Sequence, residues 1–396
     1  MEQGIRIHLS RPDITEKEIE SVVSVLRSPN LSLGPKLTEF EEKFADYVGS
    51  RFAIAVNSGT SGLHLAVRCL RIGEKDAVIT TPFSFVASAN CILYEKALPV
   101  FVDIDERTWN IDPEKIEDYL KGSCTREGPW GIPVDKRTGR YVRAILPVHI
   151  FGLPCDMERI TNLAREYNLG VIEDACEAVG AEFNGRKAGT FGNLGVFAFY
   201  PNKQITTGEG GLIVTDDESF ASLCRSLRNQ GRGEDGRWLD HHLLGYNYRI
   251  SDINCALGIA QLERIDEILE KRDRVACRYN ELLKRVVLVP EVSGDVRRSW
   301  FVYVVCLPKK HPQEVRDKIL AELNGRGIGC KNYFPPIHLQ PYYRERFGFK
   351  EGDFEVTEAL SKRTLALPFH NHLKEDEIVS VAETLKGILE RWSESP

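Results

Sequence analysis

Near the middle of the chain, Lys203 lies between two apolar β-like runs, Gly195 to Phe199 and Leu212 to Val214, and beside a glycine-rich turn. Lysines are mostly solvated surface groups, and this setting is unusual for a solvated one. A lysine amine that is removed from water becomes a nucleophile toward carbonyl groups. Lys203 is therefore the first candidate for chemistry, and a plain surface lysine is the alternative.

Two further segments carry groups of the kind that catalysis uses. Asp174 stands at the end of an apolar run from Gly170, and an acid at the carboxyl end of a strand points into the crevice where α/β sheets bind ligands. A helix-capping aspartate is the alternative. Residues 57–62 (Asn-Ser-Gly-Thr-Ser-Gly) lie between an expected strand and an expected helix. Free N–H groups at such a helix start suit a phosphate, although a structural turn explains the pattern equally well.

Together, the three segments have the chemistry that one cofactor requires. A nucleophilic lysine can form a Schiff base with pyridoxal 5′-phosphate (PLP). An acid keeps the pyridine nitrogen protonated, so that the ring acts as an electron sink, and the glycine-rich turn anchors the phosphate. Lys203, Asp174 and residues 57–62 therefore predict a PLP site.

Short apolar runs and helix-like stretches alternate along residues 1–250, and these elements must position the candidate residues. The expected strands are residues 52–56, 77–80, 99–102, 144–148 and 170–172, with helices after Thr15, from about residue 61 and over residues 157–167. This alternation predicts a large α/β domain with a mostly parallel sheet flanked by helices. Residues 123–141, rich in glycine, proline and charge, are expected to leave the sheet.

Residues 251–396 predict a smaller α+β domain. One helix is expected from Ser251 through Leu269, and its charged face is interpreted as solvated. A β-like run over residues 301–307, a helix over residues 312–323 and a terminal helix follow it. The terminal helix carries Ile378, Val381, Leu385 and Leu389 on one face.

Composition argues against several classes of protein. The chain has 52 Lys and Arg against 58 Asp and Glu, so its net charge of −6 does not suit nucleic acid. Its ten cysteines are never closer than 21 residues, which gives no zinc or redox motif and favours reduced thiols in the cytoplasm. The N-terminus lacks a signal-peptide pattern, and no apolar stretch predicts a membrane span. The pairs His241–His242 and His370–His372 lack zinc-site spacing, so no metal site is expected.

Eight segments, in order along nearly the whole chain, resemble the nucleotide-sugar aminotransferases of the DegT/StrS type. They are SGTSGLHLA (58–66), TPFSFVASAN (81–90), FVDIDERTWNID (101–112), VHIFGLPCDM (148–157), IEDACEAVGAEFNGRKAGTFG (172–192), FAFYPNKQITTGEGG (197–211), GYNYRISDINCALGIAQLERI (245–265) and FPPIHLQPYY (334–343). The lysine and Glu-Asp-Ala segments are highly specific as a pair. The resemblance implies the fold of type I PLP-dependent transferases.

By this resemblance, Lys203 is the Schiff-base lysine and the acid/base that moves a proton between cofactor and substrate carbons. Asp174 pairs with the pyridine nitrogen. The resemblance also implies an active site at a dimer interface, and hence a homodimer with shared sites. The other matching positions are Gly59, Thr60 and Ser61 at the phosphate, Phe85 against the ring, Asn247 reaching a phosphate across the subunit boundary and, more weakly, Arg249 on the same surface.

Two positions depart from the family pattern. Ala198 stands where the family often has a phosphate-binding serine, so that contact is missing or supplied elsewhere. Glu177 stands where glutamine or histidine often lies near the phenolic oxygen of the cofactor; either one of the two anions holds a proton, or Glu177 turns away. His338 could line the sugar pocket or simply pack there, and His149 is interpreted as a core histidine rather than a cofactor contact.

The resulting expectation is a PLP-dependent aminotransferase that transfers an amino group from L-glutamate to a keto sugar, expected to be nucleotide-linked. Two alternatives stay open. A sugar dehydratase of the same fold is one, although relatives of that kind replace the lysine with histidine, and Lys203 argues against it. A PLP-binding regulatory protein without turnover is the other, and the full set of catalytic residue types argues against it.

Overall fold

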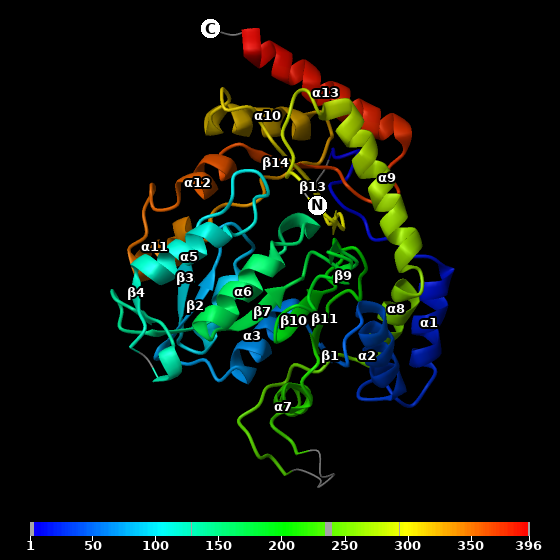
Figure 1. The fold of residues 1–396 in the computed structure, drawn as a ribbon. Coiled ribbons are helices and arrows are strands. Elements are labelled where there is room, and N and C mark those ends of the chain that lie inside the picture. Colours follow the sequence, from blue (N-terminus) through cyan, green and yellow to red (C-terminus); the bar gives the residue numbers. More distant parts are fainter. Residues whose placement is uncertain (1–3, 128, 234–239, 293, 395–396) are drawn as a thin grey trace.

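The computed structural model describes residues 4–127, 129–233, 240–292 and 294–394, and a central β-sheet runs through its middle (Figure 1). The strand order is β1 (Phe52–Val56), β11 (Gly211–Thr215), β10 (Leu194–Ala198), β7 (Gly170–Asp174), β6 (Tyr141–Ile145), β2 (Asp76–Thr80), β3 (Leu98–Phe101). In this order, each strand from β10 to β3 is parallel to the next, whereas β11 is antiparallel to both β1 and β10. The predicted α/β class with a mostly parallel sheet is confirmed.

Helices cover both faces of this sheet because successive strand residues point to opposite sides. In β1, Ile54 and Val56 belong to the core on one face, and Ala53 and Ala55 to the core on the other. The first face is covered by α3 (Gly59–Cys69), α4 (Ala87–Tyr94) and α7 (Glu218–Arg228), and the second by α2 (Pro35–Val48), α8 (Asp252–Leu262), α5 (Pro113–Gly122) and α6 (Met157–Tyr167).

A separate hydrophobic core lies at the end of the molecule where α10 and α13 are seen in Figure 1. It forms the smaller α+β part of the predicted fold, and the N-terminal segment is tied to it, since Phe369 donates its N–H to the carbonyl of Leu9. The proposed boundary after residue 250 stays a prediction. The elements here are α9 (Ile265–Leu283), α10 (Gln313–Gly325), α13 (Glu375–Glu394) and the antiparallel pair β13 (Tyr303–Cys306) and β14 (Thr364–Leu367).

The single helix predicted from Ser251 through Leu269 is wrong, because α8 ends at Leu262 and α9 begins at Ile265. Arg264 leaves helical geometry at the break (φ −114°, ψ 12°) and extends its guanidinium to Glu18 on α1 (Glu16–Leu26) at 2.7 Å. The interpretation of the whole charged face as solvated is also wrong, since the Arg264 side chain is only 10% exposed.

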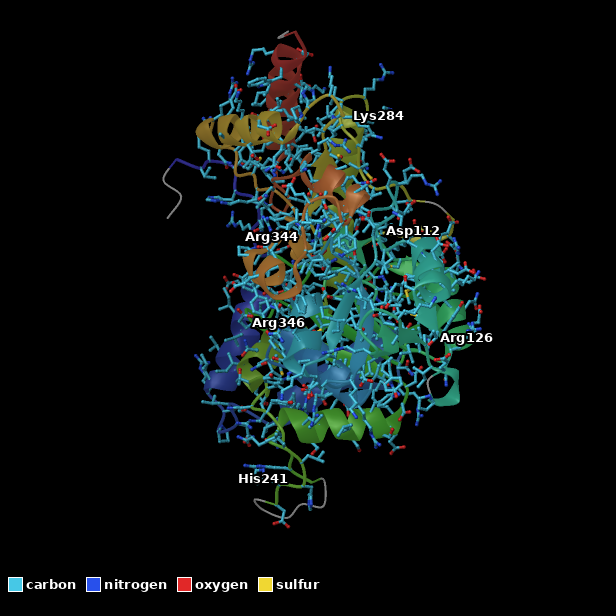
Figure 2. The ribbon with its side chains drawn as sticks, turned by 90° about the vertical axis from the view of Figure 1, so that its left-hand side faces the viewer. Asp112, Arg126, His241, Lys284, Arg344 and Arg346 are labelled. Atoms are coloured by element: carbon cyan, nitrogen blue, oxygen red, sulfur yellow. The ribbon has the colours of Figure 1, made fainter. Side chains whose placement is uncertain are left out.

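The remaining elements lie at the periphery. The predicted excursion over residues 123–141 contains β4 (Cys124–Thr125) and β5 (Val134–Asp135), and β5 pairs with β6. β8 (Glu182–Phe183), β9 (Arg186–Lys187) and β12 (Val296–Arg297) form a small antiparallel sheet, and α11 (Pro341–Phe347) and α12 (Glu355–Ser361) precede β14. Figure 2 shows Arg344 and Arg346 on α11, and His241 on a segment that projects from the body beyond α7.

The described ranges contain no helix that is both long and apolar enough to cross a membrane. The same ranges contain no cluster of three or more histidine, cysteine, aspartate or glutamate side chains arranged to hold a metal ion.

Candidate active site

A cavity of about 450 Å³ lies at the carboxyl ends of the sheet strands. Its size falls within the range of about 300–1,000 Å³ that is usual for small-molecule sites. The loops that follow β1, β2, β6, β7 and β10 form one side, and Phe301, Tyr333 and Phe334, which belong to a hydrophobic cluster with Phe83 and Phe151, close the other. The lining residues are Ser58, Gly59, Thr60, Leu63, Ser84, Phe85, Ala87, Ser88, Val148, Asp174, Cys176, Glu177, Ala198, Tyr200, Asn202, Lys203, Glu209, Gly210, Phe301, Tyr333 and Phe334.

The turn from β1 into α3 presents the start of a helix to this cavity. Ser58 caps the helix by accepting the N–H of Ser61 at 3.1 Å, and the hydroxyl of Ser61 donates to Asn57 at 2.6 Å. Gly59 and Thr60 line the cavity at the first helical positions, where backbone N–H groups have no partner within the helix. This arrangement fits a phosphate, and it uses the hydroxyl of Ser61 inside the turn rather than in the cavity.

Glycine at position 59 is required by close packing. A Cβ built on Gly59 would lie 2.7 Å from the Cβ of Ala198 and 2.9 Å from the Sγ of Cys176. Both distances are shorter than real Cβ contacts. The helix start can therefore approach the ends of β7 and β10 only because residue 59 has no side chain.

Asp174 ends β7 and is 5% exposed, with its carboxylate at the wall of the cavity. Ser88 on α4 donates its hydroxyl to one carboxylate oxygen at 2.7 Å, and the N–H of Cys176 donates to the other at 3.1 Å. A carboxylate held by two donors keeps a fixed direction. Asp174 is thus a buried carboxylate with a fixed direction at the cavity wall, and its pairing with a ring nitrogen stays a prediction.

The side chain of Lys203 is 13% exposed, so it is not the surface lysine of the alternative interpretation. Its Nζ lies 4.0 Å from the centre of the Phe301 ring and 3.7 Å from a carboxylate oxygen of Glu177. The turn that carries it is closed by the Lys203 N–H, which donates to the carbonyl of Tyr200 at 2.9 Å. The amine therefore stands inside the cavity between an aromatic face and an acid.

Glu177 does not turn away from the cavity. One carboxylate oxygen faces Lys203, and the other accepts the N–H of Phe151 at 2.8 Å. Burial raises the pKa of Glu177, and the opposing influence of Lys203 is smaller. Of the two possibilities left open by the sequence, this geometry favours a carboxyl that can hold a proton.

Phe85 also lines the cavity, and its ring is 59% exposed in the single chain, so it has a free face. Ala198 lies in the lining as well, at the end of β10, and contributes no hydroxyl. In this part of the lining, the helix start at Gly59 and Thr60 is therefore where a phosphate could find backbone donors.

Four of the predicted residues do not line the cavity: Ser61, which is bonded within the turn, His338, Asn247 and Arg249. His338 is fully buried and lies 3.1 Å from the carboxylate of Glu358. Asn247 touches the β1–α3 turn only through its backbone, which accepts from Asn57 at 3.4 Å, and Arg249 donates to Asn229 at 3.1 Å. Neither Asn247 nor Arg249 lines the cavity of its own chain.

The histidine interpreted as part of the core has that role in the structure. His149 is fully buried, its Nε2 lies 3.0 Å from Glu173, and its Nδ1 accepts the N–H of Cys155.

Reasoning from the sequence missed several residues of the site. Ser88, the partner of Asp174, lies four residues after Ser84, so a helical turn would place both on one face. Phe301 and Tyr333 come from the C-terminal part of the chain, and no local pattern connects them to Lys203.

Comparisons with known proteins agree with this geometry. The sequence profile of the DegT/DnrJ/EryC1/StrS aminotransferase family matches residues 12–386. The chain belongs to this family. It is 39% identical to the GDP-perosamine synthase of Caulobacter vibrioides over 389 residues, which cover 97% of this chain and 98% of that protein.

Solved structures agree as well. The aminotransferase PseC of Helicobacter pylori, involved in pseudoaminic acid biosynthesis, superposes with a TM-score of 0.88 at 27% identity, covering 97% of this chain and 99% of PseC. Spr1654 of Streptococcus pneumoniae, described as a putative sugar aminotransferase and solved in its PMP-form, has a TM-score of 0.88 at 27% identity, covering 98% of this chain and 100% of Spr1654. The chain is thus a PLP-dependent sugar aminotransferase, and its buried lysine, buried acid and open helix start fit that cofactor.

Proposed function

We propose that this enzyme transfers an amino group from L-glutamate to the keto carbon of a nucleotide-linked sugar, with Lys203 as the Schiff-base lysine. The observation that carries the proposal is the convergence of Lys203, Asp174 and the start of α3 on one cavity. Lysine, acid and phosphate donors come from segments that are far apart in the sequence. Packing or capping roles for each residue separately do not explain why they meet.

In this proposal each residue acts at a stated atom. PLP, when bound, supplies a carbonyl carbon for amines and a ring that accepts electrons. The N–H groups of Gly59 and Thr60 hold its phosphate, and the carboxylate of Asp174, fixed by Ser88, keeps a proton on its ring nitrogen. Phe85, which also lines the cavity, would face the ring, and Asp174 and the helix start would together set the orientation of the cofactor.

Lys203 then moves protons at its Nζ. The ring of Phe301 at 4.0 Å shields the amine from water on one side, and Glu177 at 3.7 Å is close enough to exchange a proton with it after a small movement. Positioned acid/base groups of this kind contribute roughly 10²–10⁴ in rate.

Two facts support a nucleotide-linked sugar as the substrate. Relatives include GDP-perosamine synthases and a spore coat polysaccharide biosynthesis protein of Bacillus subtilis, SpsC. A second cavity of about 880 Å³ shares Ser84, Phe85, Tyr333 and Phe334 with the first, and Tyr94 and Tyr342 add aromatic surface to it. A ligand that enters the first cavity therefore has room to extend along aromatic walls.

We also propose that the enzyme is a homodimer with shared sites, working in the cytoplasm where nucleotide sugars are made. Asn247 and Arg249 lie outside the cavity of their own chain, whereas Tyr200 and Phe85 at its mouth are more than half exposed. A second copy would cover this mouth. The test mixes inactive Lys203→Ala and Asn247→Ala subunits: shared sites predict partial recovery of activity in the mixture, and independent sites predict none.

A panel of nucleotide-linked keto sugars, incubated with PLP-loaded enzyme and L-glutamate, tests the reaction itself. We expect one sugar to gain an amine, detected by mass spectrometry, with equal formation of 2-oxoglutarate, and we expect Lys203→Ala to abolish both. A deoxy-keto product would indicate a dehydratase. Absence of 2-oxoglutarate across the panel would favour a regulatory protein.

A further inference from the structure

Directly behind the turn that carries Lys203 lies a buried arginine. Arg272 on α9 is 4% exposed, and its Nη2 donates to the carbonyl of Lys203 at 2.9 Å and to that of Asn202 at 3.4 Å. The ring of Phe369 lies 5.4 Å from its Cζ. Among the ion pairs of the described residues, none joins Arg272 to a carboxylate, and its Nε has no hydrogen-bond partner there.

Stability alone does not account for an arginine at this position. A buried cation without a carboxylate partner is costly, and burial lowers the pKa of Arg272 to about 10. Apolar side chains of similar volume often replace buried charges without loss of stability. A role in holding the turn that carries Lys203 would account for the arginine at this position.

The two carbonyls that Arg272 contacts belong to the two peptide planes on either side of the Lys203 Cα. Fixing both planes fixes the direction of the Cα–Cβ bond, and hence the path of the side chain toward the cavity. The other hydrogen bonds of the turn have partners elsewhere. The N–H of Lys203 donates to the carbonyl of Tyr200, and the side chain of Gln204 donates to the carbonyl of Glu177 at 2.6 Å. The hydrogen bonds of Arg272 hold the turn from the side of α9.

Arg272 also occupies a special place along α9. Ile268 and Leu269 pack in the core that includes α2 and α8, whereas Val275 and Ala276 pack in the core at the other end of the molecule. Arg272 lies between these two pairs, where the helix passes from one core to the other. A rigid helix anchored in both cores gives its guanidinium a fixed position relative to the cavity.

We propose that Arg272 is a positioning residue for Lys203, which aims the amine into the cavity by binding both flanking carbonyls. This inference rests on the proposed function of Lys203. A misplacement of about 1 Å can cost on the order of 100-fold in rate. Because Arg272 does not line the cavity, its loss should lower the attachment of the cofactor and kcat, but leave the KM values for donor and sugar nearly unchanged.

The test uses Arg272→Met and Arg272→Lys with a matched control. Arg363 is also buried, and its guanidinium also donates to two backbone carbonyls, those of Leu307 and Ala359, far from Lys203 in the sequence and outside the cavity lining. For every variant, three quantities are measured: the share of PLP linked to Lys203 after borohydride reduction, hydrogen exchange over residues 200–206 in the cofactor-free protein, and kcat with both KM values.

For Arg272→Met we expect faster exchange at the turn, a several-fold lower share of linked PLP, and a loss of kcat of roughly 10- to 100-fold with KM changed less than twofold. Arg272→Lys, which keeps the charge but lacks the planar fork, should recover part of each loss. Arg363→Met should lower the unfolding temperature and leave the linked share and kcat at wild-type values.

The inference would be overturned if Arg272→Met kept the hydrogen exchange, the share of linked PLP and the kcat of the wild type. It would also be overturned if the loss of linked PLP and of kcat were fully explained by the fraction of the variant that is unfolded. If Arg272→Met does not fold, the same comparison is made with Arg272→Lys, and wild-type values there overturn it. Failure of the proposed function has a different signature, since the wild-type protein itself would then carry no PLP on Lys203.

Discussion

The close packing at Gly59 allows a quantitative prediction about the phosphate end of the site. In Gly59→Ala, the new Cβ would start 2.7 Å from Ala198 and 2.9 Å from Cys176, whereas ordinary Cβ contacts begin at 3.4 Å. The start of α3 must therefore move by about 0.7 Å away from β10. Overpacking of this kind costs about 1–3 kcal/mol of stability.

The same movement displaces the N–H groups that we propose as phosphate donors. A loss of about 1.4 kcal/mol in PLP binding corresponds to a tenfold higher Kd. We therefore expect Gly59→Ala to fold with a lower unfolding temperature and to bind PLP at least tenfold more weakly, measured by absorbance titration of the cofactor-free protein.

Two further variants test whether the close contacts at residue 59 are what weakens PLP binding. Gly122→Ala is the control, since its Cβ would have no heavy atom within 4 Å, and PLP affinity should not change. Adding Ala198→Gly to Gly59→Ala removes one of the two close contacts and should recover part of the affinity. A folded Gly59→Ala protein that binds PLP as tightly as the wild type would refute this account of the phosphate site.

The titration of Glu177 predicts a pH dependence of stability. Burial raises its pKa above the unfolded value, so the folded state favours the protonated carboxyl and loses that advantage as the pH rises through the folded-state pKa. Glu177→Gln should raise the unfolding temperature of the cofactor-free protein relative to wild type more at pH 8 than at pH 5, and a constant difference would contradict this. His338→Leu tests the pocket role of His338. Because the wild-type histidine contacts buried Glu358 rather than the cavity, losing its polar ring should cost about 1–3 kcal/mol of stability in urea and leave the sugar KM unchanged; a raised KM would restore the pocket role.

Local sequence signals were sufficient to place most strands of the sheet, although the strand expected over residues 144–148 is β6 at Tyr141–Ile145. Strand β1 and helix α6 have the predicted bounds, because apolar runs between turn residues leave few other conformations. Asp174 ends β7 and Lys203 follows β10. Because these two strands are parallel neighbours, both residues lie at the same edge of the sheet.

Features that depend on distant packing were not predictable from the sequence. At the break between α8 and α9, Arg264 contacts Glu18 on α1, across more than two hundred residues of chain. The support of Asp174 by Ser88 and of Lys203 by Arg272 likewise arises between elements that no spacing rule connects.

The identity of the lysine that holds PLP tests the central claim most directly. PLP-loaded protein is reduced with borohydride and digested, and the modified peptide is located by mass spectrometry. The geometry predicts a single modified lysine, residue 203, whose Nζ stands between Phe301 and Glu177. Modification of a different lysine, or of none, would contradict it.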